Sequence, residues 1–360
     1  MAKGIGAPAT RQNQRLEVML RSGLAVARYC LGRWDGLRDE VVRLLSEVSD
    51  YATSRIDLEL VAGCLATAHG EADDALAWLR RVTEAAVEIG AYEVVPLAAG
   101  SWTRATLALG DVEGALTCVR SLVDVLDAKG VWASAGWAVP VTVEALVDAG
   151  RLTEASQFAD RAERELRDLD TPLAGAATRS ARGVLAAAGG DVRAAADDFR
   201  AAAQRYDALP APYEAARAYE RAAGCQLDHD PDGDRGAAAL REAAAIYRRL
   251  GATWDYARAA SLARRHGVGL PARHRGGRRG YGTALSPRER EVASLAARGR
   301  ANKQIAQELF TTASTVEKHL VAAMRKLRVR SRTELAHWLA EAGSKDSGFP
   351  SRPARARPWS

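Results

Sequence analysis

Apolar residues recur at intervals of three and four along most of residues 16–266, and this spacing is the period of amphipathic α-helices. In residues 112–129, for example, Val112, Leu116 and Val119 fall on one side of a helical wheel, and charged residues fall elsewhere. Glycines and other turn residues interrupt the pattern about twice in every 40 residues. The pattern therefore predicts a long series of helices of about 17 residues each.

The interruptions form an internal repeat with a period near 40 residues. The motif Gly-x-x-x-x-Ala recurs at intervals of 40, 40, 40 and 43, and a second series of turn residues runs in phase with it. A glycine that ends a helix can adopt the left-handed conformation, and the alanine five residues later lets two helices approach closely. Such self-similarity predicts an α-solenoid of helical hairpins. The motif begins at Gly70, Gly110, Gly150, Gly190 and Gly233, after an earlier copy, Gly32…Leu37; the second series is Gly90, Gly130, Asp170, Pro210 and Gly251.

Composition favours helices and two domains. The 360 residues are 48% hydrophobic but only 6% aromatic, and alanine, the best helix former, is abundant. The four cysteines are far apart, which argues against a zinc site or a disulfide framework and for a reducing compartment. We find no signal peptide and no apolar run long enough to span a membrane, and we therefore expect a cytoplasmic protein without a metal or cofactor.

The net charge of +6 combines two opposite regions. Residues 264–360 carry 21 Lys and Arg against 7 Asp and Glu, a net charge of +14, whereas residues 1–263 carry a net charge of −8. This asymmetry predicts that only the C-terminal end binds a polyanion.

The basic end begins with residues 267–284, which contain six glycines and no acidic residue. This composition predicts a flexible linker, and its arginines either lie along a phosphate backbone or only keep the linker soluble. Capping boxes and turn residues then predict four short helices, at about 287–297, 303–309, 313–327 and 332–341. Short helices joined by a tight turn, followed by a helix with many exposed polar residues, are typical of a helix-turn-helix. The linker arginines are Arg273, Arg275, Arg278 and Arg279.

Residues 285–336 closely resemble the LuxR-type DNA-binding domain. The resemblance rests on Pro287-Arg288-Glu289, Glu291-Val292, Asn302-Lys303-x-Ile305-Ala306, Thr315-Val316, His319, Lys326-Leu327 and Val329-x-Ser331-Arg332. It departs from the family at Arg328, where the family usually has a glycine that ends the recognition helix with a positive φ angle.

The resemblance implies that the third helix enters the major groove and reads base edges. Glu317 stands where the family often has lysine, so we expect either a different target sequence or only a local capping interaction with Ser314. The family's base-contacting positions map onto Ser314, Glu317, Lys318 and Val321.

Phosphate contacts would position the domain without reading sequence, although each residue taken singly can also be a solvated surface charge. The fourth helix resembles the family's dimerisation helix, and its apolar face can equally be core. The expected phosphate contacts are Lys303, Thr312, Thr315, His319, Arg325, Lys326 and Arg332, and the expected dimerisation residues are Leu335, Ala336 and Leu339.

The N-terminal repeats are similar to the tetratricopeptide class, and most of all to its longer-helix variant in large bacterial transcription activators. First helices line the concave face in this class, where tryptophans and arginines can form an effector groove, or the tryptophans can belong to the core. The candidate groove residues are Trp102, Arg104, Trp132, Trp137 and Arg179.

Other motifs were weighed and rejected. Asp228-x-Asp230-x-Asp232-Gly233 resembles the start of an EF-hand, but Ala239 stands where a bidentate glutamate is required. We find no P-loop and no catalytic motif, so an enzyme is not expected.

Together these patterns predict an all-α chain and a transcriptional regulator that binds double-stranded DNA as a homodimer. RNA polymerase and a peptide, protein or small-molecule effector are its further expected partners. The alternative is an interaction scaffold for which DNA binding is only a tether. The predicted parts are a flexible N-terminus (1–15), the solenoid (16–266), the linker (267–284), the helix-turn-helix domain (285–342) and a disordered tail (343–360).

Overall fold

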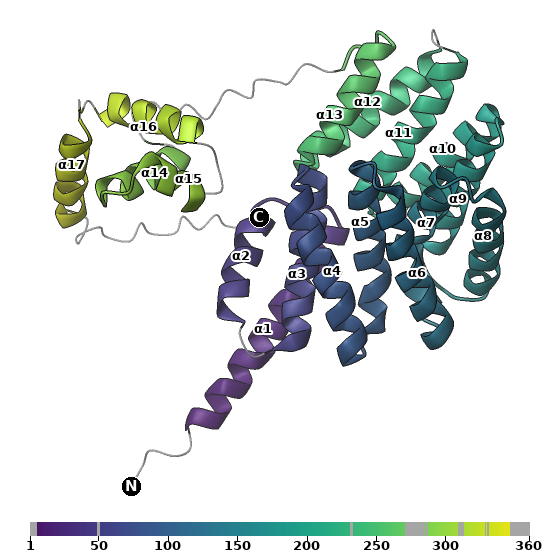
Figure 1. The fold of residues 1–360 in the computed structure, drawn as a ribbon, viewed down its shortest axis with the longest axis horizontal. Helices are drawn as coiled ribbons and strands as arrows, with labels where there is room; N and C mark the ends of the chain where they lie inside the picture. Colours follow the sequence, from purple (N-terminus) through teal and green to yellow (C-terminus); the bar gives the residue numbers. More distant parts are fainter. Residues whose placement is uncertain are drawn as a thin grey trace, which may run out of the picture. The chain divides into compact units, whose positions relative to one another are not determined.

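The computed structural model describes residues 6–48, 51–230, 233–270, 285, 287–308, 313–327, 329 and 331–345. All regular secondary structure in these ranges is helical, so the predicted all-α fold is confirmed. Contacts divide the chain into two compact units, Met1–Pro271 and Ala272–Ser360 (Figure 1).

The first unit is a series of helices in which each packs against the next, as the repeat pattern predicted (Figure 1). Its elements are α1 (Gly6–Cys30), α2 (Leu37–Glu47), α3 (Ala52–His69), α4 (Ala72–Ile89), η1 (Tyr92–Val94), α5 (Val95–Ala108), α6 (Val112–Lys129), η2 (Trp132–Trp137), α7 (Val139–Asp148), α8 (Leu152–Arg167), α9 (Ala174–Ala188), α10 (Val192–Ala208), α11 (Pro212–His229), α12 (Asp234–Leu250) and α13 (Thr253–Arg265).

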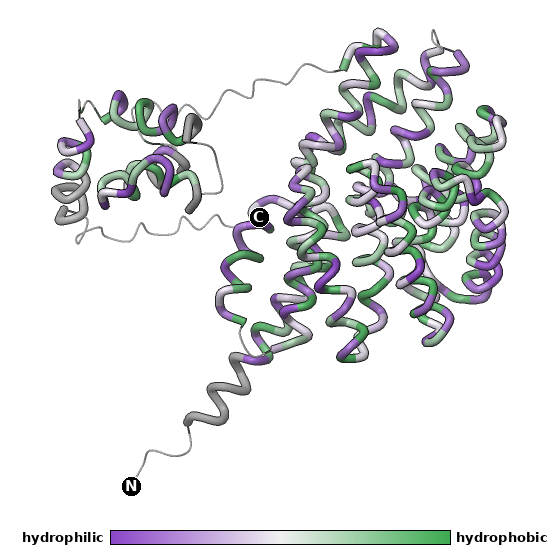
Figure 2. The backbone as a smooth tube through the Cα atoms, in the orientation of Figure 1, coloured by the Kyte–Doolittle hydropathy of each residue, from purple (hydrophilic) through white to green (hydrophobic). Residues whose placement is uncertain are grey.

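Amphipathic helices account for this stacking. In α8, the buried residues Ala155, Phe158, Ala159, Ala162 and Leu166 follow helical spacing, and the remaining positions are mostly charged or polar. Figure 2 shows hydrophobic and hydrophilic positions alternating in this way along the helices of the first unit. A single hairpin would leave one apolar face in water, so each hairpin requires its neighbours.

The glycine and alanine markers act as predicted in four repeats. Gly70, Gly110, Gly150 and Gly190 follow first helices and have φ angles of 78°, 76°, 72° and 81°. The alanines five residues later have no exposed surface, which is consistent with close helix packing: Ala75, Ala115, Ala155 and Ala195.

The marker assigned to the fifth repeat is wrong. Gly233 has a φ angle of −72° and caps the start of α12, so it does not end α11. The fourth residue of α12, which is equivalent to Ala115 in α6, is therefore Ala237; Ala237 is buried and Ala238 is exposed. Gly233 is equivalent to Asp191 before α10 and not to Gly190, so one residue of the longer interval of 43 comes from the choice of marker.

Helix α1 begins at Gly6, so residues 6–15 of the segment that was predicted as a flexible N-terminus (1–15) are helical. Pro8 lies in the first turn, where its missing N–H would have no helical partner in any case. Residues 9–15 are largely polar and carry little apolar periodicity, so the pattern could not detect this part of the helix.

The two ends of the first unit contact each other. Helix α13 packs against α3, and a Cβ added at Gly70 would lie 2.7 Å from the Trp254 ring. Similarly, a Cβ at Gly32, after α1, would lie 2.4 Å from Pro212 of α11. Helices almost 200 residues apart in sequence therefore share one core.

Tyr213 of α11 lies where the two ends meet. Its ring centroid is 5.1 Å from that of Trp34 and 6.2 Å from that of Tyr247, and Trp34 stacks on Tyr29 at 5.2 Å. The Tyr213 hydroxyl donates a 2.7 Å hydrogen bond to the buried carboxylate of Asp255 in α13.

The second unit has its own core. Its helices are α14 (Pro287–Ala297), α15 (Asn302–Glu308), α16 (Ala313–Leu327) and α17 (Arg332–Lys345), close to the predicted ranges. Helix α14 packs against both α16 and α17, and α15 packs against α16. The fully buried residues include Val292, Ile305, Val316, Ala323 and Leu335.

Local details of this unit refine the capping predictions. The Ser331 hydroxyl accepts a 3.1 Å hydrogen bond from the Glu334 amide, as expected for a capping box. Asn302 was predicted to cap the second helix, but it is the first residue of α15, and its side chain accepts a hydrogen bond from Arg332. Ser286, Thr312, Arg328 and the linker arginines lie outside the described residues.

We expect Gly130→Ala to destabilise the protein by about 1 kcal/mol, because Gly130 has a φ angle of 66° that a Cβ disfavours. Gly23→Ala is the matched control, since Gly23 lies within α1 with open space around it, and we expect it to stabilise by about 0.5–1 kcal/mol. Urea unfolding followed by circular dichroism measures both. Equal effects of the two substitutions would contradict the role given to the repeat glycines.

Glu289 and Lys326 tie α14 to α16 through a 2.5 Å ion pair whose side chains are only 10% and 20% exposed. We expect Glu289→Ala to cost about 3 kcal/mol, because it leaves a largely buried ammonium without this carboxylate. Glu317→Ala, at an exposed acid of the same unit, should change stability by less than about 0.5 kcal/mol. Similar losses in both variants, measured by thermal unfolding, would refute this assignment.

Candidate nucleic-acid interface

Helix α16 exposes one face and buries the opposite one. Its buried residues are Val316, Leu320 and Ala323, which pack on α14 and α15. The helical period then turns Glu317, Lys318, Val321 and Arg325 to the surface, and all four are exposed. This face carries both signs of charge beside an aliphatic side chain, so it offers a donor, an acceptor and an apolar contact.

Val321 is an apolar residue of this face and is 56% exposed. An aliphatic side chain in that position gains nothing from water, and it suits contact with an apolar group such as a thymine methyl. Ser314 and Thr315 belong to α16, but their side chains lie outside the described residues, so the Ser314–Glu317 alternative stays a prediction.

The residues predicted to contact phosphate separate into two groups. Lys303 on α15 and Arg325 on α16 are exposed, and His319 is half-buried. Lys326 and Arg332 instead bind within the unit, Lys326 to Glu289.

Arg332 holds the turn between α14 and α15. Its guanidinium donates to the carbonyl oxygens of Ala296 and Arg300 and, at 3.0 Å, to the Asn302 side chain. Satisfying turn carbonyls in this way supports the turn that precedes α15, so Arg332 links α17 to the start of α15.

The turn between α14 and α15 also presents basic residues that pattern reasoning missed. Arg298 and Arg300 are exposed on either side of Gly299, whose φ angle is 81°. The sequence signal that could have identified Arg298 and Arg300 is the clustering of basic residues directly after a predicted helix end.

The predicted dimerisation residues of α17 lie in different surroundings. Leu335 is fully buried in the core of its own unit, Ala336 is half-buried, and the side chain of Leu339 lies outside the described residues. Trp338, which was not singled out from sequence, is 40% exposed on the same helix.

The predicted effector residues of the first unit do not form one groove. Trp132 is buried against Phe158, with centroids 6.2 Å apart, and belongs to η2. Arg179 pairs with Asp198 and lines one hollow, whereas Arg104 lines another. Trp102 and Trp137 are partly buried residues packed on the main core.

The described residues contain no group of three or more metal-binding side chains, and none of their helices is long and apolar enough to cross a membrane. Burial raises the pKa of the Cys30 and Cys118 thiols to about 12, so both stay protonated at neutral pH.

Comparisons with known proteins match the second unit. The family of bacterial regulatory proteins, luxR family, matches residues 283–339. The nitrate/nitrite response regulator protein NarL of Escherichia coli is 44% identical over 55 residues, which cover 15% of this chain and 26% of that protein. The oxygen regulatory protein NreC of Staphylococcus carnosus is 44% identical over 54 residues, 15% of this chain and 25% of that protein.

Another match is longer. A putative HTH-type transcriptional regulator of Mycobacterium bovis is 38% identical over 93 residues, 25% of this chain and 10% of that protein. The chain thus spans between a tenth and about a quarter of the length of these curated relatives. Four helices in the expected order, together with these matches, show that the C-terminal unit of this chain contains a LuxR-family helix-turn-helix domain.

Proposed function

We propose that this protein is a DNA-binding transcriptional regulator that reads a specific sequence through α16 in the major groove. The observation that carries the proposal is the exposed face of α16, where Glu317, Lys318 and Val321 lie opposite a fully packed core. Such a face offers a guanine donor, a cytosine acceptor and a methyl contact side by side. The names of the relatives, which are transcriptional and response regulators, support the same class of function.

The surrounding charges support phosphate contacts. Exposed Lys303 and Arg325 lie on the two helices that form the motif, so they can bind the backbone on either side of the groove. Arg332 and Lys326 would contribute indirectly. Arg332 supports the start of α15, and Lys326 ties α16 to α14 through Glu289. Thr312, Thr315 and Ser314 complete the proposed interface.

We further propose that the protein binds DNA as a homodimer and that the first unit, a tetratricopeptide-like solenoid, controls this binding. Because Leu335 is buried within its own unit, the proposed dimer contact depends on neighbouring α17 residues such as Ala336 and Trp338. The net charge of −8 on residues 1–263 would let the solenoid compete with DNA for the basic unit. RNA polymerase is the expected downstream partner.

The test of sequence recognition is a selection from random duplexes with the full chain. We expect one enriched sequence, and we expect Glu317→Ala and Lys318→Ala each to relax the preference at one position by about 1–3 kcal/mol. Arg120→Ala, at an exposed arginine of α6, is the control and should leave the selected sequence unchanged. Unaltered preference in both α16 variants would refute the recognition-helix assignment, and no preference in the native chain would favour the scaffold alternative.

Loss of a phosphate contact should change the sequence dependence and the salt dependence of DNA affinity in a different way from loss of a base contact. Lys303→Ala should weaken binding almost equally for all sequences and reduce the slope of log K against log salt by about 0.9, the value for one lost phosphate contact. Titration of one duplex at several salt concentrations measures the slope. A loss confined to the selected sequence would place Lys303 on a base instead.

A further inference from the structure

Helix α1, the first helix of the first unit (Figure 1), carries apolar residues on two opposite faces. The residues of one face are at most 6% exposed and pack the helix against α2 and α3: Val18, Ser22, Ala25 and Tyr29. The opposite face bears a row of leucines with two small residues between them, which we call the α1 stripe: Leu16, Leu20, Gly23, Leu24, Ala27 and Leu31. At 3.6 residues per turn, each of these lies within about 60° of Leu20 around the helix axis.

The leucines of the α1 stripe are open to solvent. Leu16, Leu20 and Leu24 are 50%, 63% and 55% exposed. Leu31 is 39% exposed, and its amide still donates to the Ala27 carbonyl at 3.0 Å, so it continues the helix by one residue. Single exposed leucines are common on a monomer, but a continuous row on a helix whose other face is already buried marks an interaction surface.

The α1 stripe is complementary to itself when one copy is reversed. Its members fall at equal distances on both sides of the bond between Gly23 and Leu24. Reversing one copy therefore places Leu20 opposite Ala27, and Leu24 opposite Gly23, so that a large residue meets a small one near the centre. Gly23 has open space around it, so it can receive a leucine. A two-fold interface requires such a match, because the same patch is used twice.

One flank of the α1 stripe is charged and internally paired. Arg21 binds Glu17 at 2.7 Å, and both side chains are about half exposed. Farther along the same flank, Arg28 is paired with Glu40 of α2. In an antiparallel two-fold pair, the Glu17–Arg21 end of one copy faces the Arg28–Glu40 end of the other. Two guanidinium groups and two carboxylates then meet, so the charges balance.

The other flank is apolar. It carries Met19, which is 50% exposed, and the partly buried Val26 and Cys30. A two-fold axis across two antiparallel helices brings like flanks together, so each apolar flank meets the apolar flank of the other copy. A parallel pair would instead set each charged flank against an apolar one and desolvate charges that have no new partner there. The flanks therefore favour the antiparallel arrangement.

We propose that a second copy of this chain binds the α1 stripe, with the two α1 helices antiparallel around an axis beside Gly23 and Leu24. One helix face about 22 Å long is small for a specific interface, so we expect a dimer with a dissociation constant in the micromolar range. The contact itself is independent of DNA. Its use in holding two LuxR-family domains on one duplex, in addition to α17, rests on the proposed function.

Sedimentation equilibrium of the full chain without DNA tests this contact. Between about 1 and 200 µM, the apparent mass should rise from 38.5 kDa towards twice that value. Leu20→Glu sets a carboxylate near the centre of the contact and should raise the dissociation constant at least about tenfold. Leu152→Glu is the matched control, because Leu152 on α8 is also a half-exposed leucine, and it should leave the dissociation constant unchanged.

Introduced cysteines test the orientation. In the antiparallel pair, Leu24→Cys places two thiols beside the axis, so oxidation with diamide should link two copies of this variant. Leu16→Cys places the two thiols at opposite ends of the contact, about 22 Å apart, so it should form a dimer only when mixed with Leu31→Cys. The native chain, oxidised in the same way, controls for the four natural cysteines.

Three results would overturn the assignment. A native chain that stays monomeric at about 200 µM would leave the α1 stripe without a second copy. An unchanged dissociation constant in Leu20→Glu would place the dimer contact on another surface, and linkage of Leu16→Cys alone would make the pair parallel. If Leu20→Glu loses its helical circular dichroism, the cysteine variants still decide.

The outcomes also separate this contact from DNA recognition. A dimer that Leu20→Glu dissociates, in a chain with no DNA preference, would sustain the contact and defeat only the proposed function. A chain that selects one DNA sequence but stays monomeric without DNA would do the opposite.

Discussion

The packing around Tyr213 is the contact on which the first unit depends. This side chain from α11 touches aromatic residues that precede α2, lies beneath the guanidinium of Arg104 from α5 at 5.0 Å, and donates to Asp255 of α13. One residue thus joins the beginning, the middle and the end of the series of helices. Nearest-neighbour stacking alone would allow an open solenoid, and these long-range contacts close it.

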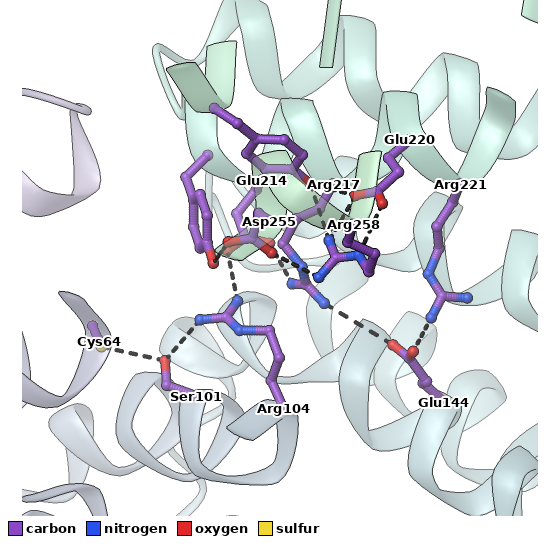
Figure 3. Close-up of polar contacts among 12 residues, drawn as sticks. Cys64, Ser101, Arg104, Glu144, Glu214, Arg217, Glu220, Arg221, Asp255 and Arg258 are labelled. Carbon is purple, nitrogen blue, oxygen red and sulfur yellow. Dashed lines mark hydrogen bonds and ion pairs between the residues drawn. The ribbon is translucent and has the colours of Figure 1, made fainter. Parts of the chain in front are cut away.

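Closure has an electrostatic consequence. It brings arginines and acids from α5, α7, α11 and α13 together, and Arg104, Glu214 and Arg217 are at most 16% exposed there, so each of these three charges needs a partner. Glu214 and Glu144 each pair with two arginines there (Figure 3), and Asp148 and Asp228 line the cavity between these helices.

In the second unit the core decides which residues face outward. Once Val316, Leu320 and Ala323 are buried against α14 and α15, the helical period leaves Glu317, Lys318 and Val321 no position except the surface. That much followed from sequence, because the apolar spacing of α16 is regular. The internal roles of Lys326 and Arg332 did not follow from the sequence. A basic residue near a helix end gives the same sequence pattern whether its side chain contacts phosphate, a buried acid or a turn carbonyl.

The helical content, the positions of most helix ends and the helix-turn-helix unit could be predicted from the amino-acid sequence, because periodicity and glycine conformation act over a few residues. It also separated the acidic and basic regions. Three features became visible only in the folded chain: α13 returns to α3, Arg104 and Arg179 line different hollows, and Asn302 accepts a hydrogen bond from Arg332 instead of capping α15. These facts depend on small angles between successive hairpins summed over the whole unit, and on side-chain partners far away in the chain, which no local pattern encodes.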